Sequence, residues 1–327
     1  MKRNSIFSEE IYKQVNQENI DILEDYTLEM KSNGKGEKTI YQYRADIKMF
    51  FCWLLSNAKN KNILELKKRE FRRFFLEMKE SGASSARINR VQCSLRNMLE
   101  YCAMDDDEYE DYEINVMKYI KGIQKEEVRT IHFITNDQVE KMLEYLIENE
   151  KYQLALYLAI SYESAGRRNE VFQIQKEGFL ENKMTNEVIG KRAKKFKLLY
   201  FNKSREIAKL YFDQRGEDGI ESLWITGKDE TKMPAKYETL YSWTVAFRDI
   251  LEKVGEERFD FNPHSFRHSS LTNFSDGSHY VLKELGSDKL DLNVLKSLAH
   301  HSSIDTTQGY LPNMDEQLLV SAFGLSE

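Results

Sequence analysis

The chain has few of the residues that mark secreted, membrane-bound or disordered proteins. Its three cysteines, Cys52, Cys93 and Cys102, are odd in number and lack metal-ligand spacing, so buried reduced thiols are expected. Three prolines and fifteen glycines leave little room for low-complexity linkers. No apolar run approaches the roughly 20 residues that span a bilayer, and no signal peptide follows Met1. These absences predict a cytoplasmic protein that does not contact membranes.

Sites for nucleotides and metals are missing as well. No glycine-rich phosphate loop occurs, so use of ATP is not indicated. His264 and His268 stand four residues apart, as two helical zinc ligands would. However, no glutamate follows His264, no cysteine lies nearby, and Arg267 would bring a cation among the ligands. The sequence therefore predicts neither a metal nor another cofactor.

Positive charge is scarce overall but concentrated in one region. The net charge is −6, yet residues 31–100 contain 16 Lys and Arg against 7 Asp and Glu, a local charge of +9. Such asymmetry favours a polyanionic partner, although a solvated helical surface accounts for it equally well. The side chains that we expect to contact DNA phosphates here are Arg44, Lys48, Arg72, Arg73, Arg87, Arg90 and Arg96.

Helical periodicity dominates residues 18–104, which follow a short tail at 1–17. Apolar side chains recur at the spacing of an α-helix, and Ser84 or Ser85 can cap the last helix. The basic side chains lie off these apolar stripes. An all-helical N-terminal domain is therefore expected, with helices at 18–31, 39–55, 66–79 and about 85–104.

Residues 105–128 are expected to connect this domain to a second one. The run 105–113 has seven acids and no base, with too little apolar content to pack. The second domain, 129–327, mixes helices with a β-hairpin. A capping box opens a helix that runs to about 148, and an apolar helix covers 152–162.

Alternating side chains predict the two strands of the hairpin at 184–190 and 196–201. The turn between them holds Lys191 and Lys194, either of which could contact DNA, although a basic turn of solvated lysines is equally ordinary. The expected fold class is mainly α with a small β-hairpin, that is, α+β.

Three short motifs carry candidate chemistry. Arg167 and Glu170 are three residues apart and so share a helical face, which a simple surface ion pair would also explain. His264 and Arg267 share a face of a helix for which Asn262 is the expected N-cap. A helix N-terminus flanked by an arginine and a histidine can bind an anion, although exposed polar residues on a capped helix fit as well.

The third motif lies near the C-terminus. His301 precedes Tyr310 by nine residues, with two threonines between them. The chain has 18 tyrosines, so only this spacing distinguishes Tyr310 from aromatic residues of the core or the surface.

Together, Ser164-Ala165-Gly166-Arg167-Arg168-Asn169-Glu170, His264-Ser265-Phe266-Arg267-His268 and His301 to Tyr310 resemble the signature of the tyrosine recombinases (phage integrase family). The resemblance covers roughly 20–327. It implies a helical, SAM-like core-binding domain, a linker, and a catalytic domain of the DNA breaking-rejoining type with a C-terminal tail at 311–327. The short N-terminal tail points to a two-domain enzyme of the Xer or invertase kind. Arg267 and His301 are farther apart than the family predicts, so an insertion is expected around 276–291.

The resemblance also implies a metal-independent and ATP-independent mechanism. Tyr310 would attack a DNA phosphodiester and leave a 3′-phosphotyrosyl bond and a free 5′-hydroxyl. Arg167 and Arg267 would grip the phosphate oxygens. The remaining roles implied are Lys191 as proton donor to the 5′-oxygen, His264 in proton transfer from the tyrosine, His301 as a hydrogen-bond donor to the phosphate, and Glu170 as an orienting residue.

Site-specific recombination is the favoured function, with double-stranded DNA bearing an inverted-repeat target site as the partner. Dimers to tetramers would assemble on that DNA, with or without accessory factors. Two alternatives stay open: a nicking-closing enzyme like the type IB topoisomerases, and a DNA-binding protein that kept the fold without the activity.

Overall fold

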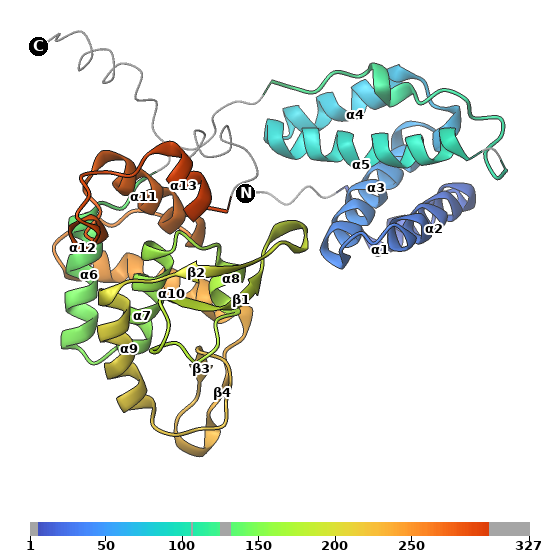
Figure 1. The fold of residues 1–327 in the computed structure, drawn as a ribbon. Helices are drawn as coiled ribbons and strands as arrows, with labels where there is room; N and C mark the ends of the chain where they lie inside the picture. The colour runs from blue at the N-terminus through green and yellow to red at the C-terminus, as the bar shows by residue number, and fades with distance from the viewer. Residues whose placement is uncertain (1–5, 106, 125–131, 301–327) are drawn as a thin grey trace, which may run out of the picture. The chain divides into compact units, whose positions relative to one another are not determined.

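The structure is a computed structural model that describes residues 6–105, 107–124 and 132–300 (Figure 1). The chain divides into two compact units, residues 1–130 and 131–327, each with its own hydrophobic core. The first is helical. The second is mainly helical with small antiparallel sheets, so the predicted fold class is confirmed.

The first unit contains the four helices that hydrophobic periodicity predicted. Their ends follow local capping: the Asn16 side chain accepts a hydrogen bond from the Glu18 amide, and the Ser84 hydroxyl accepts one from the Arg87 amide. The sequence did not indicate the short helix α1 or the 3₁₀ turns η1 and η2. The elements are α1 (Glu9–Tyr12), α2 (Gln17–Ser32), α3 (Glu37–Asn57), η1 (Ile63–Glu65), α4 (Lys68–Glu80), α5 (Ser85–Met104) and η2 (Val116–Tyr119).

Aromatic side chains fill the core of the first unit. Phe50 of α3 is fully buried, with ring centroids 5.1 Å from Phe71 and 4.9 Å from Phe74, both of α4. Offset and edge-on ring packing of this kind adds stabilisation beyond the burial of area. The apolar face of α4 is therefore committed to the core, which leaves its basic residues outside.

The acidic segment after α5 packs against the first unit, so the prediction that it would not pack was wrong. The Tyr109 hydroxyl donates to Asp25 at 2.6 Å, and Met117 of η2 is fully buried. Arg96 donates to the carbonyls of Met117 at 3.2 Å and Ile120 at 3.0 Å. Tyr109 and Tyr112, which stand between the acids, supply the apolar surface, and counting charges alone overlooked them.

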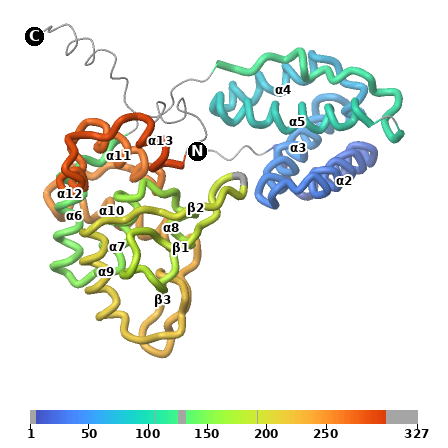
Figure 2. Tube along the Cα trace, in the orientation of Figure 1, coloured from blue at the N-terminus to red at the C-terminus, as the bar shows by residue number. Residues whose placement is uncertain are grey.

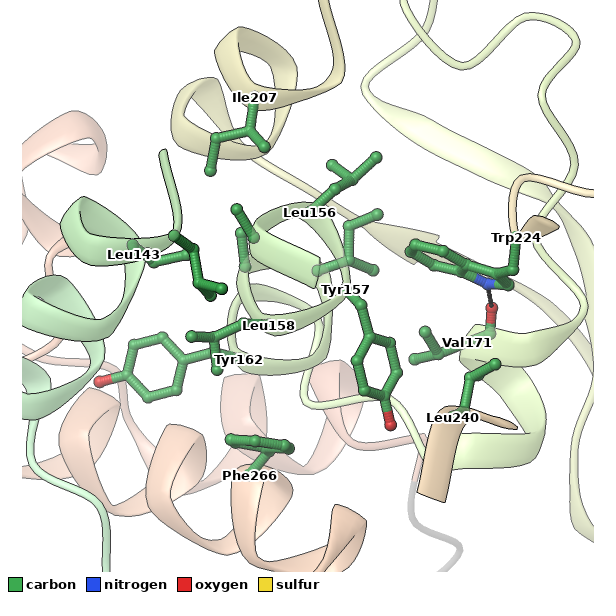
Figure 3. Packing of buried hydrophobic residues seen from close by; sticks show 14 of the residues in the cluster. Leu143, Leu156, Tyr157, Leu158, Tyr162, Val171, Ile207, Trp224, Leu240 and Phe266 are labelled. Carbon is green, nitrogen blue, oxygen red and sulfur yellow. Dashed lines mark hydrogen bonds between the residues drawn. The ribbon is translucent and has the colours of Figure 1, made fainter. Parts of the chain in front are cut away.

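The second unit is built around α7, whose residues from Ala155 to its end are all buried. Leu143 and Phe266 pack around it, and Trp224 donates its indole N–H to the Val171 carbonyl at 2.7 Å (Figure 3). That bond ties α8 to the core. The helices are α6 (Asn136–Glu148), α7 (Tyr152–Glu163), α8 (Arg168–Phe172), α9 (Asn202–Arg215), α10 (Tyr237–Lys253), α11 (Pro263–Asp276), α12 (Val281–Leu285) and α13 (Leu292–Leu298).

The predicted β-hairpin is present. Strands β1 (Met184–Ile189) and β2 (Lys195–Leu199) are antiparallel, and Val188 pairs with Phe196. A 3₁₀ turn, η3 (Lys191–Ala193), joins them. A smaller hairpin that the sequence did not indicate consists of β3 (Ile225–Thr226), η4 (Asp229–Thr231) and β4 (Met233–Pro234).

Helices α11, α12 and α13 lie together at one end of the second unit (Figure 2). The segment expected as an insertion contains α12 and the loops beside it. Its start is fixed by Gly277, which has φ of +91° and closes α11, where a Cβ would come within 2.7 Å of the Asp288 carbonyl oxygen. The loop after α12 then returns the chain to α11, where the Leu290 amide donates to the Phe274 carbonyl.

Candidate active site

The loop between α7 and α8 presents the first arginine. Arg167 is the N-cap residue of α8, and the Glu170 carboxylate accepts from both its backbone amide and its Nη1, each at 2.8 Å. Glu170 is buried, whereas the Arg167 side chain keeps 29% of its surface exposed. One carboxylate therefore caps the helix and aims the guanidinium, and the contact follows the i, i+3 spacing.

Arg168, the neighbouring arginine, faces other residues. Its guanidinium lies over the Tyr237 ring, 3.9 Å from the centroid, and 5.4 Å from that of Tyr241. The structure thus separates the two adjacent arginines, since Glu170 holds only Arg167.

The second arginine comes from α11. The Asn262 side chain accepts from the His264 amide at 2.9 Å, and Pro263 occupies the first turn, as the sequence predicts. Arg267, one turn along, is fully buried and donates to the Ala165 carbonyl at 2.6 Å and to the Ala299 carbonyl. It therefore joins the loop before Arg167 to the end of α13.

Ala165 sits in the left-handed region with φ of +49°, which is uncommon for a residue with a side chain. Its next neighbour Gly166 is tightly enclosed, because an added Cβ would lie 2.9 Å from the Ser164 hydroxyl and 3.0 Å from Val171. In this sharp loop the Ala165 carbonyl accepts a hydrogen bond from Arg267, and Arg167 follows two residues later.

The β1–β2 turn approaches the Glu170 carboxylate. A Cβ on Gly190 would come within 2.5 Å of the Phe196 ring and 3.2 Å of a Glu170 oxygen, so only glycine allows this approach. Lys191 begins η3 and Lys194 directly follows it, and both side chains are exposed. The turn therefore carries two basic side chains beside the first arginine motif.

His300 is a residue that sequence reasoning missed. It follows α13 with φ of +51°, and its ring stacks on Phe196 with centroids 3.8 Å apart. Burial lowers its pKa to about 4; the Glu170 charge opposes that effect, and the charges of Lys194, Arg267 and Arg167 add to it. The Ala299 carbonyl that accepts from Arg267 directly precedes His300, so His300 lies beside the group that we call the arginine cluster: Arg167, Glu170, His264 and Arg267.

His301 and Tyr310, the two residues predicted from the third motif, lie outside the described residues. Two histidines stand side by side at 300 and 301. The nine-residue spacing to Tyr310 favoured His301 in the sequence. Only the structure shows that His300, which follows α13, stacks on Phe196.

The other cluster histidine is His264. Its ring is 4.8 Å from that of His268, and its pKa is lowered to about 4, first by loss of solvation and then by the charges of His268, Arg267 and Arg167. Both cluster histidines are thus neutral near pH 7, so each has a ring nitrogen that can accept a proton. Two arginines, neutral imidazoles and exposed lysines form a site suited to a phosphodiester. Among the described residues, no three His, Cys, Asp or Glu side chains gather as metal ligands.

The basic residues predicted to contact DNA in the first unit have different surroundings. Arg44 pairs with Glu24 and Arg73 with Glu77, while Arg90 pairs with buried Asp46. Arg87 approaches the Met49 sulfur at 3.9 Å, and Lys48 lies over the Tyr12 ring at 4.4 Å. Arg72 is exposed on α4. Arg96, by contrast, holds the segment after α5, so it is first of all a structural residue.

Comparisons with known proteins agree with this geometry. The model of the phage integrase family matches residues 132–317. The SPbeta prophage-derived recombinase-like protein YomM of Bacillus subtilis (strain 168) is 27% identical over 318 residues, 92% of this chain and 89% of that protein. The tyrosine recombinase XerC of Treponema denticola is 25% identical over 298 residues, 86% of this chain and 90% of that protein. A crystal structure of the XerH site-specific recombinase bound to palindromic difH substrate matches with a TM-score of 0.66 at 18% identity, covering 93% of this chain and 83% of that one.

The fold and the cluster define an enzyme that transfers DNA strands. Because the family model covers more than half of the chain, the chain belongs to the phage integrase family, and it is a tyrosine-type site-specific recombinase. No helix in the described ranges is long and apolar enough to cross a membrane.

Proposed function

We propose that the cluster around Arg167 and Arg267 is the phosphoryl-transfer site of this recombinase, with Tyr310 as its nucleophile. The observation that carries the proposal is the Ala165 loop, which accepts a hydrogen bond from Arg267 and positions Arg167 two residues later. The Arg267 side chain is thereby joined to the backbone of the loop that precedes Arg167. Paired guanidinium forks match the non-bridging oxygens of a phosphodiester and the charge that develops on them.

The remaining roles follow from position and charge. The Tyr310 oxygen attacks phosphorus, the bond from phosphorus to the 5′-oxygen breaks, and a 3′-phosphotyrosyl bond forms. His264, neutral near pH 7, accepts the phenol proton, and His300 or His301 donates a hydrogen bond to the phosphate. Lys191 gives a proton to the departing 5′-oxygen, and Lys194 is the alternative in the same turn. Glu170 holds Arg167 in place.

The first unit acts as the DNA-binding part of the enzyme. Its support is the exposed basic face of α4, with Arg72 and Arg73, opposite the buried phenylalanines of that helix. The partner is double-stranded DNA with an inverted-repeat site, in the bacterial cytoplasm, and the enzyme assembles on it as dimers to tetramers. XerH, whose structure contains a palindromic substrate, provides the parallel.

A suicide-substrate experiment tests the site. A nicked duplex built from the repeats that flank the gene should form an SDS-stable complex with the wild-type protein and none with Tyr310→Phe, which should still bind the duplex. A covalent complex with the Phe variant would move the nucleophile to another tyrosine. That tyrosine is not Tyr280, because its hydroxyl donates to buried Glu163 at 3.0 Å.

A substrate with a sulfur leaving group tests which lysine is the proton donor. A 5′-phosphorothiolate at the scissile position needs no proton on its leaving group, so it should restore cleavage by Lys191→Ala but not by Arg267→Ala. Rescue of Lys194→Ala instead would transfer the role three residues along the turn. Joining of strands from two different duplexes separates recombination from simple nicking and closing.

A further inference from the structure

Arg168 is an arginine for which the proposed mechanism has no use, yet its surroundings are well built. Its guanidinium lies 3.9 Å from the centroid of Tyr237, the first residue of α10, and 5.4 Å from that of Tyr241, one turn later. Tyr237 is itself packed edge-on against Phe172 of α8, with centroids 5.6 Å apart. The two tyrosine rings thus form a platform against which the guanidinium carbon lies.

The edges of this guanidinium are left for a ligand. Within the described part of the chain, Arg168 makes no ion pair and donates no hydrogen bond. Aromatic rings contact the face of a guanidinium, whereas its N–H donors point outward in the plane. Tyr241 is 44% exposed, so the platform reaches the surface.

The position of Arg168 in the chain puts it beside DNA held at the active site. It directly follows Arg167, and adjacent Cα atoms are only about 3.8 Å apart. Successive phosphates of one DNA strand advance about 3.4 Å along the helix axis. A strand whose phosphate is bound by Arg167 therefore passes near the backbone of Arg168, from which its side chain extends to the Tyr237 ring.

We propose that Arg168, held on Tyr237 and Tyr241, is a DNA contact next to the scissile phosphate and not a catalytic residue. This rests on the proposed function, in which Arg167 binds that phosphate. Its ligand is a pair of acceptors in one plane, which DNA offers as two phosphate oxygens or as O6 and N7 of a guanine. The platform fixes the fork before DNA arrives, which lowers the entropy lost on binding.

The test compares full-length wild type with Arg168→Ala and Arg168→Lys. Each protein selects binding sites from a pool of random duplexes, and affinities for the selected and an unrelated duplex are then measured at several salt concentrations. A guanine contact predicts that Arg168→Ala loses the preference for G at one position, with affinity for the selected site roughly 5- to 150-fold lower. A phosphate contact predicts an equal loss on both duplexes and a log–log salt slope smaller by about 0.9.

The conservative variants distinguish the platform from a general charge effect. Arg168→Lys keeps the charge but not the fork, so it should behave like the alanine variant at a guanine and nearly like wild type at a phosphate. Tyr237→Leu removes the ring and should weaken binding in the same direction as Arg168→Ala. Lys209→Ala, which removes an exposed charge from α9, is the matched control and should leave sequence preference unchanged.

Two results would overturn the assignment. One is an Arg168→Ala protein with wild-type affinity, preference and salt slope. The other is a variant that binds normally but forms the covalent complex much more slowly at saturating DNA, because Arg168 would then belong to the catalytic group. If Arg168→Ala fails to fold, Arg168→Gln keeps most of the apolar stem and is judged by the same measurements. Failure of the wild type itself to form a covalent complex would instead reject the proposed function.

Discussion

Arg44, Arg73 and Arg90 of the first unit are held differently from Arg267 of the second. In the first unit, Arg44, Arg73 and Arg90 pair with carboxylates of the same helix or a neighbouring one, at side-chain exposures of 24%, 56% and 43%. In the second unit, fully buried Arg267 donates to two backbone carbonyls. Backbone carbonyls position a guanidinium without contributing a net charge, whereas a carboxylate partner neutralises its positive charge. The contrast indicates that Arg267 is held at a fixed point by the backbone of two distant segments, while Arg44, Arg73 and Arg90 contribute balanced charge to a surface.

We expect the largest effect, a loss of DNA cleavage, from substitution of Arg267. Arg267→Lys keeps the charge but cannot span the Ala165 and Ala299 carbonyls and a phosphate together, so cleavage should fall by about 10²–10³. Arg90→Lys in the first unit should retain most activity. The measurement is single-turnover cleavage of the suicide duplex at saturating enzyme. Equal losses in the two variants would remove the distinction between the units.

Glu163, a buried carboxylate of the second unit that has no arginine partner among the described residues, allows a test by pH of how buried charged groups are held. Glu163, at the end of α7, accepts from the Phe201 and Ser204 amides and the Tyr280 hydroxyl, and burial raises its pKa to about 7. A folded-state pKa above the ordinary 4.5 means that this group's contribution to stability is lost as the pH rises from about 4.5 to about 7. The difference amounts to roughly 3 kcal/mol.

Glu163→Gln should therefore flatten this part of the pH dependence. The quantity to measure is the difference in unfolding free energy between wild type and variant at pH 5, 6, 7 and 8 in urea. Subtraction removes the opposite trend from His264 and His300, whose lowered pKa values make stability rise with pH up to about 6.5. A difference that is constant with pH would show that Glu163 does not titrate in this range. In the first unit, buried Asp46 pairs with Arg90, so Asp46→Asn serves as the comparison.

A smaller effect is expected where an arginine of the first unit holds backbone. Arg96→Ala removes the donors to the Met117 and Ile120 carbonyls and should destabilise the unit by about 1–3 kcal/mol. For the same reason a fragment ending at residue 124 should unfold cooperatively, whereas one ending at 113 loses buried Met117 and should be less stable. Chemical denaturation followed by circular dichroism checks both. If the two fragments were equally stable, the segment after α5 would not be part of this unit.

The smallest effect belongs to the surface pairs. Arg44→Ala should change stability by no more than about 1 kcal/mol, since exposed ion pairs contribute little.

If the basic face binds DNA, Arg72→Ala should weaken binding to all duplexes alike and reduce the salt slope by about 0.9. Gel-shift titrations at several salt concentrations measure this. An unchanged slope would mean that Arg72 does not face DNA.

The sequence by itself determined the long helices of the first unit and the main hairpin of the second. Periodicity is a local property, so the helices of the first unit and the hairpin at 184–199 were predictable, as were the caps at Ser84 and Asn262. The spacing of Arg167 and Glu170 likewise predicted their contact, because three residues along a helix bring two side chains together.

The tertiary structure alone decided the contacts between residues far apart in the chain. The spacing to Glu170 already favoured Arg167 over Arg168 in the sequence, and the structure adds that Arg168 lies over Tyr237, some seventy residues later. His300 is identified by Phe196 of β2, about a hundred residues earlier. Tyr109 and Met117 pack against the core of the first unit although residues 105–113 contain seven acids. Each of these choices depends on a partner far away in the chain, and the packing of whole elements, which no local pattern encodes, selects that partner.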